Sequence, residues 1–101
     1  MITRIVRMEF HPERVDDFLK VFEANKNQIA GYPGCLRLEL HRSIHEPNIL
    51  YTISRWFSED ALNDYRSSEL FLSTWKQTKI HFAAPAQAWS TGALFDSDNI
   101  K

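Results

Sequence analysis

The side chains in this sequence that are best suited to chemistry are a histidine and two tyrosines set among large aromatic residues. His81 follows a stretch rich in Phe and Trp. Imidazole titrates near neutral pH, which suits removal of a phenolic or carbon-bound proton. Tyr51 and Tyr65 carry hydroxyl groups that can donate a hydrogen bond to a carbonyl or to a developing oxyanion. We therefore expect His81 to act as a general base with Tyr65 or Tyr51 as hydrogen-bond donor, the alternative being a structural histidine.

Aromatic residues make up 13% of the chain, which is high for a length of 101 residues. Trp56 ends one apolar run, and Phe71 and Trp75 lie four residues apart in a helical pattern. Together with Tyr65 they are suited to form the walls of a slot for a flat polycyclic or quinoid ligand. The alternative is that these rings only fill a core.

No metal or cofactor site is expected from the sequence. His41 and His45 flank a turn, and no His, Cys or carboxylate group has the spacing of a metal-binding motif. No glycine-rich phosphate loop is present either. The single cysteine, Cys35, permits no internal disulfide and is typical of a reducing cytoplasm.

Composition and charge exclude several classes of protein for this chain. The chain is 44% apolar and 25% charged, with a net charge of −1, so we expect one globular domain and no binding to nucleic acid. No apolar run approaches the roughly 18–20 residues of a membrane span, and no signal peptide is evident. We expect a cytoplasmic protein with one domain over residues 1–95 and a polar tail over residues 96–101.

The positions of apolar residues predict the elements that must position these side chains. Strands alternate with period 2, helices place apolar residues three or four apart, and Pro12, Gly31 and Ser58 mark helix ends. The predicted elements are a strand over 2–10, a helix from Pro12 to Gly31, strands over 35–42 and 50–57, helices over 59–66 and from Ser67 or Ser68 to about 82, and a strand over 87–95. The order β-α-β-β-α-β predicts an α+β, ferredoxin-like fold with an antiparallel four-stranded sheet.

Helices can cover only one face of such a sheet. The other face would carry apolar residues such as Ile5 mixed with the charged residues Arg37, Glu39 and His41. A large exposed apolar patch of this kind usually marks an interface, and a two-fold dimer is the commonest arrangement. We therefore expect a homodimer, although the sequence leaves open whether these three charged residues face a partner or a cavity.

Over about residues 1–95 the chain resembles the antibiotic biosynthesis monooxygenase (ABM) domain family. The resemblance is carried by the first strand with Pro12 and by four motifs, which are Tyr32-Pro33-Gly34-Cys35, Glu39-Leu40-His41-Arg42, Arg55-Trp56-Phe57-Ser58 and the stretch from Ala61 to Glu69. It implies a dimeric α/β barrel, in which two ferredoxin-like chains associate through their sheets.

The resemblance also implies a chemistry, the cofactor-independent oxidation of aromatic polyketides or quinols by O2. In the best-known polyketide enzyme of the family, an Asn on a strand is followed four residues later by a Trp, and then by a Tyr and an Arg. Here the Trp is Trp56, and Thr52 stands at the Asn position as a substrate-binding candidate. The Tyr and Arg positions fall near Leu62 and Phe71.

Two alternatives to this monooxygenase remain open at the level of sequence. One is a non-catalytic module that binds a small aromatic ligand with the same fold. The other is a relative of the haem-degrading enzymes, whose Asn, Trp and iron-binding His correspond to about Val6, Tyr65 and Trp75. Since the iron ligand is replaced, haem binding would require His81 in a shifted arrangement.

Overall fold

The computed structural model describes residues 1–99, and it has the predicted ferredoxin-like α+β fold. The strands are β1 (Ile2–Glu9), β2 (Cys35–Arg42), β3 (Ile49–Trp56) and β4 (Gln87–Thr91). The helices are α1 (Val15–Ala30), α2 (Glu59–Arg66) and α3 (Glu69–Lys79), with short 3-10 turns η1 (Pro12–Arg14) and η2 (Ser97–Asn99). None of these helices combines the length and the apolar character that crossing a bilayer requires.

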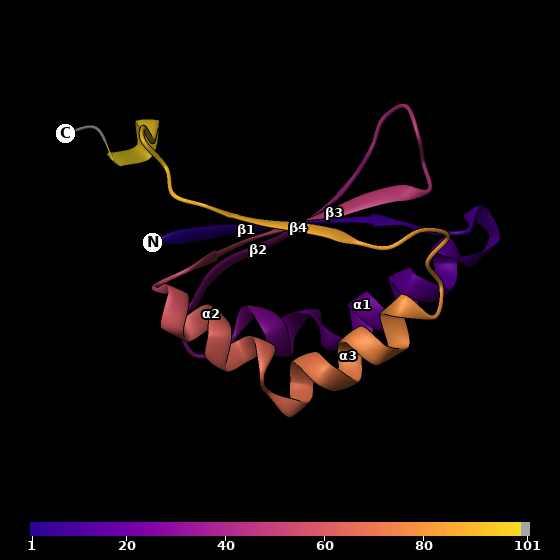
Figure 1. The fold of residues 1–101 in the computed structure, drawn as a ribbon, viewed down its shortest axis with the longest axis horizontal. Coiled ribbons are helices and arrows are strands. Elements are labelled where there is room, and N and C mark those ends of the chain that lie inside the picture. The colour runs from indigo at the N-terminus through magenta and orange to yellow at the C-terminus, as the bar shows by residue number, and fades with distance from the viewer. Residues whose placement is uncertain (100–101) are drawn as a thin grey trace.

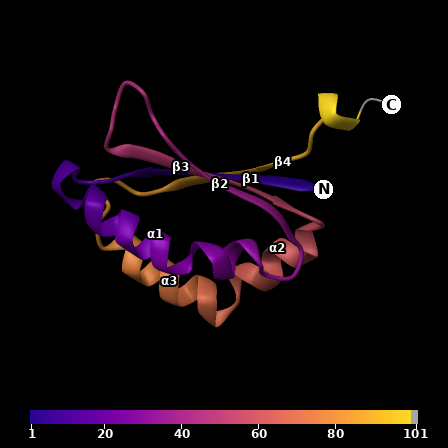
Figure 2. The same cartoon turned by 180° about the vertical axis from the view of Figure 1, so that it is seen from behind.

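The four strands form one antiparallel sheet in the order β2-β3-β1-β4. All three helices lie on the same side of this sheet, as both views of the fold show (Figure 1, Figure 2). Because strand side chains alternate between faces, Val6 and Met8 of β1 point toward the helices, whereas Ile5 and Arg7 point to the open face. The sheet therefore has one covered and one uncovered face, as predicted.

The core lies where α1 crosses the sheet. Its buried cluster contains Met8, Phe10, Val15, Phe18 and Leu50, and the partly buried Leu19 and Phe22 pack against it. The spacing of the α1 members is the helical spacing read from the sequence. Phe10 stacks on Phe18 with ring centroids 4.5 Å apart, so α1 is fixed against the ends of β1 and β3.

Two serines divide the second helical region into α2 and α3. The side chain of Ser58 accepts a hydrogen bond from the backbone N–H of Ala61, and that of Ser68 accepts one from Phe71. Each satisfies a backbone N–H at a helix N-terminus that would otherwise have no partner. The predicted cap at Ser58 is confirmed, and the restart is at Ser68 rather than Ser67.

Leu36 does not continue the alternation of Leu38 and Leu40 along β2. The register shifts between Cys35 and Arg37, so Leu36 is the extra residue of a β-bulge. Its side chain is 52% exposed. Strict alternation cannot anticipate a bulge, because the inserted residue reverses the faces on one side of it.

The last strand is shorter than predicted, ending at Thr91 rather than Phe95. Thr91 pairs with Thr3, and β1 itself begins at Ile2, so the chain beyond Thr91 has almost no strand left to pair with. The predicted polar tail begins at Asp96, whose carboxylate lies 3.2 Å from the Arg55 guanidinium. Residues 100 and 101 of that tail lie outside the described residues.

Candidate active site

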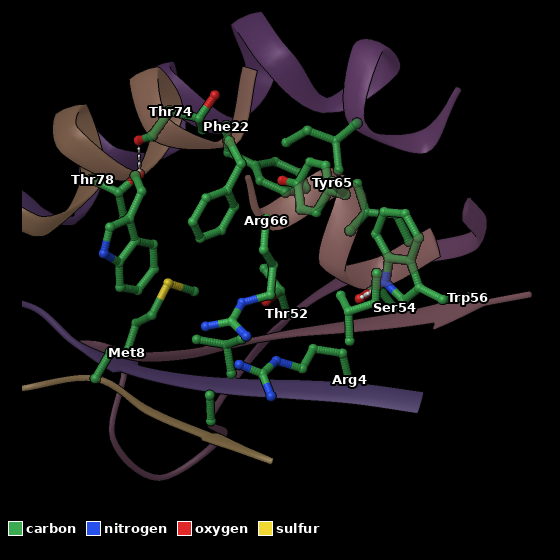
Figure 3. Close-up of a pocket in the computed structure, with 18 of the residues that line it drawn as sticks. Arg4, Met8, Phe22, Thr52, Ser54, Trp56, Tyr65, Arg66, Thr74 and Thr78 are labelled. Carbon is green, nitrogen blue, oxygen red and sulfur yellow. Dashed lines mark hydrogen bonds between the residues drawn. The ribbon is translucent and has the colours of Figure 1, made fainter. Parts of the chain in front are cut away.

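A cavity of about 270 Å³ lies between the sheet and the helices (Figure 3). The alternation of β1 and β3 directs side chains from both central strands into it, and α2 and α3 close it from the other side. Its lining residues are Arg4, Val6, Met8, Phe18, Phe22, Ile29, Leu38, Thr52, Ser54, Trp56, Leu62, Tyr65, Arg66, Phe71, Thr74, Trp75, Thr78, Ala86 and Ala88. Most of these are apolar or aromatic, as is typical of a small-molecule site.

Trp56 and Tyr65 form one end of the aromatic wall. Trp56 is 1% exposed, and its indole Nε1 donates a hydrogen bond to Ser54 Oγ at 2.9 Å. Its ring stacks on that of Tyr65, with centroids 4.9 Å apart and planes inclined by 25°. Because the indole N–H has a partner and the ring is fully packed, the position of Trp56 is fixed before any ligand binds.

The aromatic wall continues along α3. Phe71 meets Tyr65 edge to face with centroids 5.3 Å apart, and it stacks on Trp75 at 5.8 Å with planes only 11° apart. Trp75 in turn contacts the edge of Phe82. These contacts join Trp56, Tyr65, Phe71 and Trp75 into one continuous aromatic surface, which offers ring faces and edges to a flat ligand.

Tyr65 has an electrostatic property that bears on its chemistry. Burial, with a smaller contribution from Cys35, raises the pKa of Tyr65 to about 12. The phenol therefore stays protonated throughout the physiological range, because burial disfavours the charged form. Tyr65 can donate a hydrogen bond to a ligand oxygen, but it does not act as a base at neutral pH.

The predicted site residues divide into two groups. Trp56, Tyr65, Trp75, Phe71 and Thr52 all line the cavity. Tyr51 and His81 do not.

Tyr51 faces the open side of the sheet, where its register partners are Arg7 on β1 and His41 on β2. His81 follows the end of α3 and is nearly buried. Within the described residues its Nδ1 is buried without a hydrogen-bond partner. The structure thus brings together the predicted aromatic residues and Thr52, but it places neither the imidazole of His81 nor the phenol of Tyr51 among them.

Two arginines that were not among the predicted site residues also line the cavity. They are Arg4 on β1 and Arg66 at the end of α2. Figure 3 shows their guanidinium groups extending toward one another between sheet and helices. Arg4 Nη1 donates a hydrogen bond to Ser90 Oγ at 3.0 Å. Burial and, second, the positive charge of Arg66 lower the pKa of the Arg4 guanidinium.

The sequence does carry a signal for both arginines. Arg4 is the one charged residue on the face of the first strand that it shares with Val6 and Met8. Arg66 lies four residues after the buried Leu62, which places both on one face of α2. A charge on an otherwise apolar face is informative, because burying it without a function is costly.

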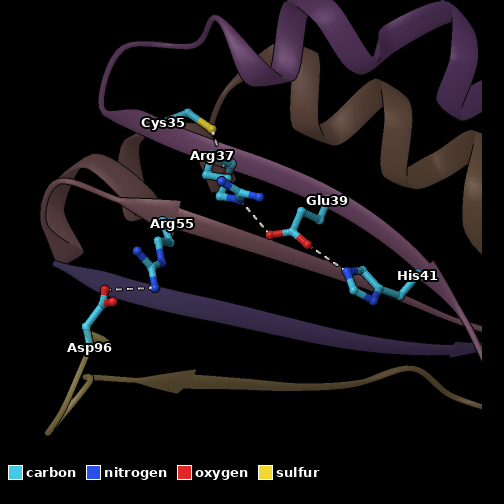
Figure 4. A network of polar contacts seen from close by, with 6 residues as sticks. All are labelled: Cys35, Arg37, Glu39, His41, Arg55 and Asp96. Carbon is cyan, nitrogen blue, oxygen red and sulfur yellow. Dashed lines mark hydrogen bonds and ion pairs between the residues drawn. The ribbon is translucent and has the colours of Figure 1, made fainter. Parts of the chain in front are cut away.

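A second polar cluster lies on the open face of the sheet, away from the cavity (Figure 4). Arg37 Nε donates a hydrogen bond to Glu39 Oε2 at 2.6 Å, and His41 Nε2 lies 2.7 Å from Glu39 Oε1. The hydrogen bonds from His41 and then from Arg37 lower the pKa of the Glu39 carboxyl. These residues therefore belong to the uncovered face and not to the cavity.

No potential metal centre is evident in the part of the chain that the structure describes, where no three His, Cys, Asp or Glu side chains are grouped as ligands. The cavity itself offers one phenol, several hydroxyls and two guanidinium groups. These can donate hydrogen bonds to the oxygen atoms of a ligand and stabilise negative charge on them.

Solved structures share this fold over nearly the whole chain. An antibiotic biosynthesis monooxygenase is 20% identical with a TM-score of 0.87, covering 93% of this chain and 99% of its own. Rv0793 from Mycobacterium tuberculosis is also 20% identical with a TM-score of 0.87, and the match covers 95% of this chain and 97% of that one. SnoaB, a cofactor-independent oxygenase from Streptomyces nogalater, is 21% identical with a TM-score of 0.83 over 94% of both chains. At sequence identities of 20% and 21%, this structural similarity shows that the fold is shared.

Sequence comparison gives the family. No curated protein matches the chain. The profile of the antibiotic biosynthesis monooxygenase family, however, matches residues 1–77, which contain β1, the β2–β3 hairpin and most of the helical wall of the cavity. This protein belongs to the antibiotic biosynthesis monooxygenase family.

Proposed function

We propose that this protein is a cofactor-independent monooxygenase that oxidises a small aromatic, anthrone-like or quinol substrate with O2. The observation that carries the proposal is the cavity walled by Trp56, Tyr65, Phe71 and Trp75 in a member of a monooxygenase family. The similarity of the fold to SnoaB, a cofactor-independent oxygenase, supports it. Fold alone does not fix an activity, so the proposal depends on the side chains of the cavity.

The reaction needs no external reductant, because the substrate supplies the electrons. Loss of a proton from an anthrone-like methylene group gives an electron-rich carbanion, which passes one electron to O2 and then combines with the reduced oxygen. Expulsion of water completes the sequence. In sum, one methylene group and one molecule of O2 give one carbonyl group and one molecule of water, so that carbon is oxidised and both oxygen atoms are reduced. A quinol follows the same balance when a ring C–H becomes a carbonyl, because that C–H and a phenolic O–H together supply the two hydrogens of the water.

The chain contributes positioning and electrostatics to this reaction. The stacked rings hold a flat substrate in one orientation and exclude water from it. Tyr65 remains neutral and donates a hydrogen bond to the oxygen on which charge develops. Because the lining residues within the described range 1–99 include no imidazole or carboxylate, we assign removal of the proton to water at the mouth of the cavity rather than to His81.

Oxygen uptake tests the proposal. Purified protein free of flavin and metal is assayed against a panel of anthrones, hydroquinones and naphthols, together with the variant Ala88→Trp, which places an indole at the cavity rim. Ala83→Trp is the matched control, because Ala83 is exposed and does not line the cavity. We expect uptake above the uncatalysed rate for the wild type and the control, and loss of at least tenfold in Ala88→Trp.

Absence of uptake across the panel contradicts the proposed activity, and full activity in Ala88→Trp contradicts the proposed site. The second candidate function is binding of an aromatic ligand without turnover, which the absence of a base from the lining favours. Stoichiometric binding of a panel compound under air, with the compound recovered unchanged, would support that candidate. Haem binding gains no support from the cavity, since no histidine is among its lining residues in the described part of the chain.

We further propose that the protein acts as a homodimer in the cytoplasm, formed through the open face of the sheet. The central row across this face is Glu39, Ile53, Ile5 and Trp89, one residue from each strand. Trp89 is 46% exposed in the single chain. An apolar centre flanked by charged residues is the usual composition of a protein interface. The lone cysteine, Cys35, suits a reducing compartment.

A further inference from the structure

Arg4 and Arg66 are the only charged side chains among the lining residues of the cavity within residues 1–99. Arg4 reaches the cavity from the centre of the sheet, and Arg66 reaches it from the C-terminal turn of α2. Figure 3 shows both guanidinium groups near Thr52 and below Tyr65 in the view. Arg4 is partly buried and Arg66 is exposed, so two like charges lie close together beside an apolar cavity, an arrangement that a negative charge would stabilise.

The described part of the chain supplies no such negative charge. Four of the other five arginines have carboxylate partners within residues 1–99, in the pairs Arg7–Glu9, Arg14–Asp17, Arg37–Glu39 and Arg55–Asp96, whereas Arg42 is exposed at the end of β2. Arg4 instead donates to the neutral hydroxyl of Ser90, and Arg66 forms no ion pair within residues 1–99. The proximity of the two charges is also evident in the pKa of Arg4, which burial and then Arg66 lower.

We propose that Arg4 and Arg66 together bind the carboxylate of an aromatic acid whose ring system lies against the wall formed by Phe71 and Trp75. Guanidinium groups suit this role because their planar N–H donors match the two oxygens of a carboxylate. The cavity, at about 270 Å³, suits a ligand of two or three fused rings. This inference rests on the proposed function, since the acid is the substrate class of the same cavity.

The pair also explains how the site could favour loss of a substrate proton without a base in the cavity. Positive charge in a water-poor site stabilises a carbanion or phenolate more strongly than the neutral substrate. A carboxylate held by both arginines would fix the ring and leave this field acting on the reacting carbon. Specificity for an acid over its neutral analogue follows, because the analogue leaves the partly buried guanidinium group of Arg4 and the neighbouring one of Arg66 without an anion.

Binding of 2-naphthoate and its neutral isostere 2-naphthamide tests the inference. Titration calorimetry is performed at neutral pH on the wild type, Arg4→Met, Arg66→Met and the double variant. Arg42→Met is the matched control, because Arg42 is exposed at the end of β2 and does not line the cavity. Methionine keeps much of the side-chain length while removing the charge, and circular dichroism confirms that each variant is folded.

We expect 2-naphthoate to bind the wild type and the control at least tenfold more tightly than 2-naphthamide. Each single variant is expected to weaken binding of the acid about tenfold or more, with little effect on the amide. Equal binding of acid and amide overturns the inference, and so does acid binding that is indifferent to both arginines. An acid that fails to bind at all, as when a carboxylate of a second chain already occupies the pair, overturns it as well.

A third ligand separates a carboxylate from an ionised phenol, since both present an anionic oxygen. If only 2-naphthol binds, and only as the pH rises through its own ionisation in an arginine-dependent manner, the site is one for phenolates and the carboxylate assignment is wrong. Failure of the proposed function is distinguishable from these outcomes. Arginine-dependent binding of 2-naphthoate without oxygen uptake on any substrate leaves the anion site in place and removes the monooxygenase.

Discussion

At the scale of single residues, Tyr65 is where the walls of the cavity meet. Its ring stacks on Trp56 and contacts the edges of Tyr32 and Phe71. The sequence suggested an aromatic slot from residue types and helical spacing alone, and all four proposed wall residues do line the cavity. Spacing could not show which of the polar candidates line the same cavity. The position of the Tyr51 side chain depends on which face of β3 it occupies, and that of His81 depends on where α3 ends.

The raised pKa of Tyr65 leads to a prediction for the pH dependence of its ionisation and of stability. A tyrosine whose pKa is about 12 in the folded protein and about 10 when unfolded contributes stability that is fully present below pH 10. That contribution is lost as the pH rises toward 12. Spectrophotometric titration of tyrosinate should therefore show a late step that is absent in Tyr65→Phe and retained in Tyr51→Phe. A late step that persists in Tyr65→Phe would show that another tyrosine carries it.

His81 gives a second prediction at this scale. Because His81 does not line the cavity, His81→Gln should keep oxygen uptake within about threefold of the wild type, while thermal stability falls as a nearly buried ring is replaced. The pH profile of kcat should also be unchanged. A loss of a hundredfold or more in kcat with the fold intact would restore His81 as the general base.

At the scale of elements, the cavity depends on how the start of β2 meets α2. Gly34 has φ of 89°, and a Cβ built on it would lie 2.5 Å from Ala61 Cβ. The carbonyl of Gly34 accepts a hydrogen bond from the backbone N–H of Phe57, just after Trp56. The glycine therefore permits the close approach that positions Trp56 and α2 together.

Gly34→Ala should destabilise the protein by about 2 kcal/mol or more, since it adds both a left-handed alanine and a steric clash. Gly92→Ala is the matched control, because nothing lies within 4 Å of its added Cβ. Urea denaturation of both variants measures the difference. Equal midpoints for the two would show that the Gly34–Ala61 contact relaxes without cost.

The sequence predicted these elements well where a local signal existed. Ser58 and Ser68 are N-cap residues, which mark the starts of α2 and α3 in the sequence. The spacing of Val15, Phe18 and Phe22 is that of one face of a helix, as observed in α1. The bulge at Leu36 and the end of β4 at Thr91 depend on the partner strand instead. Such features follow from register, which a single strand's pattern does not contain.

At the scale of the whole molecule, the uncovered sheet face accounts for the proposed homodimer. Trp89→Glu places a charge at the centre of this face beside Ile5, its register partner. We expect the wild type to sediment as a dimer and the variant to dissociate at least tenfold more readily. Leu72→Glu, at an exposed position on α3, should remain dimeric. A monomeric wild type, or a dimeric Trp89→Glu, would contradict an interface on this face.

The overall fold was predictable because each element carries a periodic pattern and the order β-α-β-β-α-β has few compatible topologies. The charge inside the cavity was not. Arg4 and Arg66 are 62 positions apart in the sequence, and only the packing of α2 over β1 brings them together. The chemistry of the site is thus a property of the assembled molecule.

The central claim, that the cavity is the site of a monooxygenation, is tested most directly by the fate of labelled oxygen. An anthrone or quinol that is consumed by the protein is converted under 18O2 in unlabelled water, and the mass of the product is measured by mass spectrometry. The account predicts one 18O atom in each product molecule, with the second atom released as water, and loss of this product in Ala88→Trp. A product without label, or labelled product formed equally by Ala88→Trp, would contradict it.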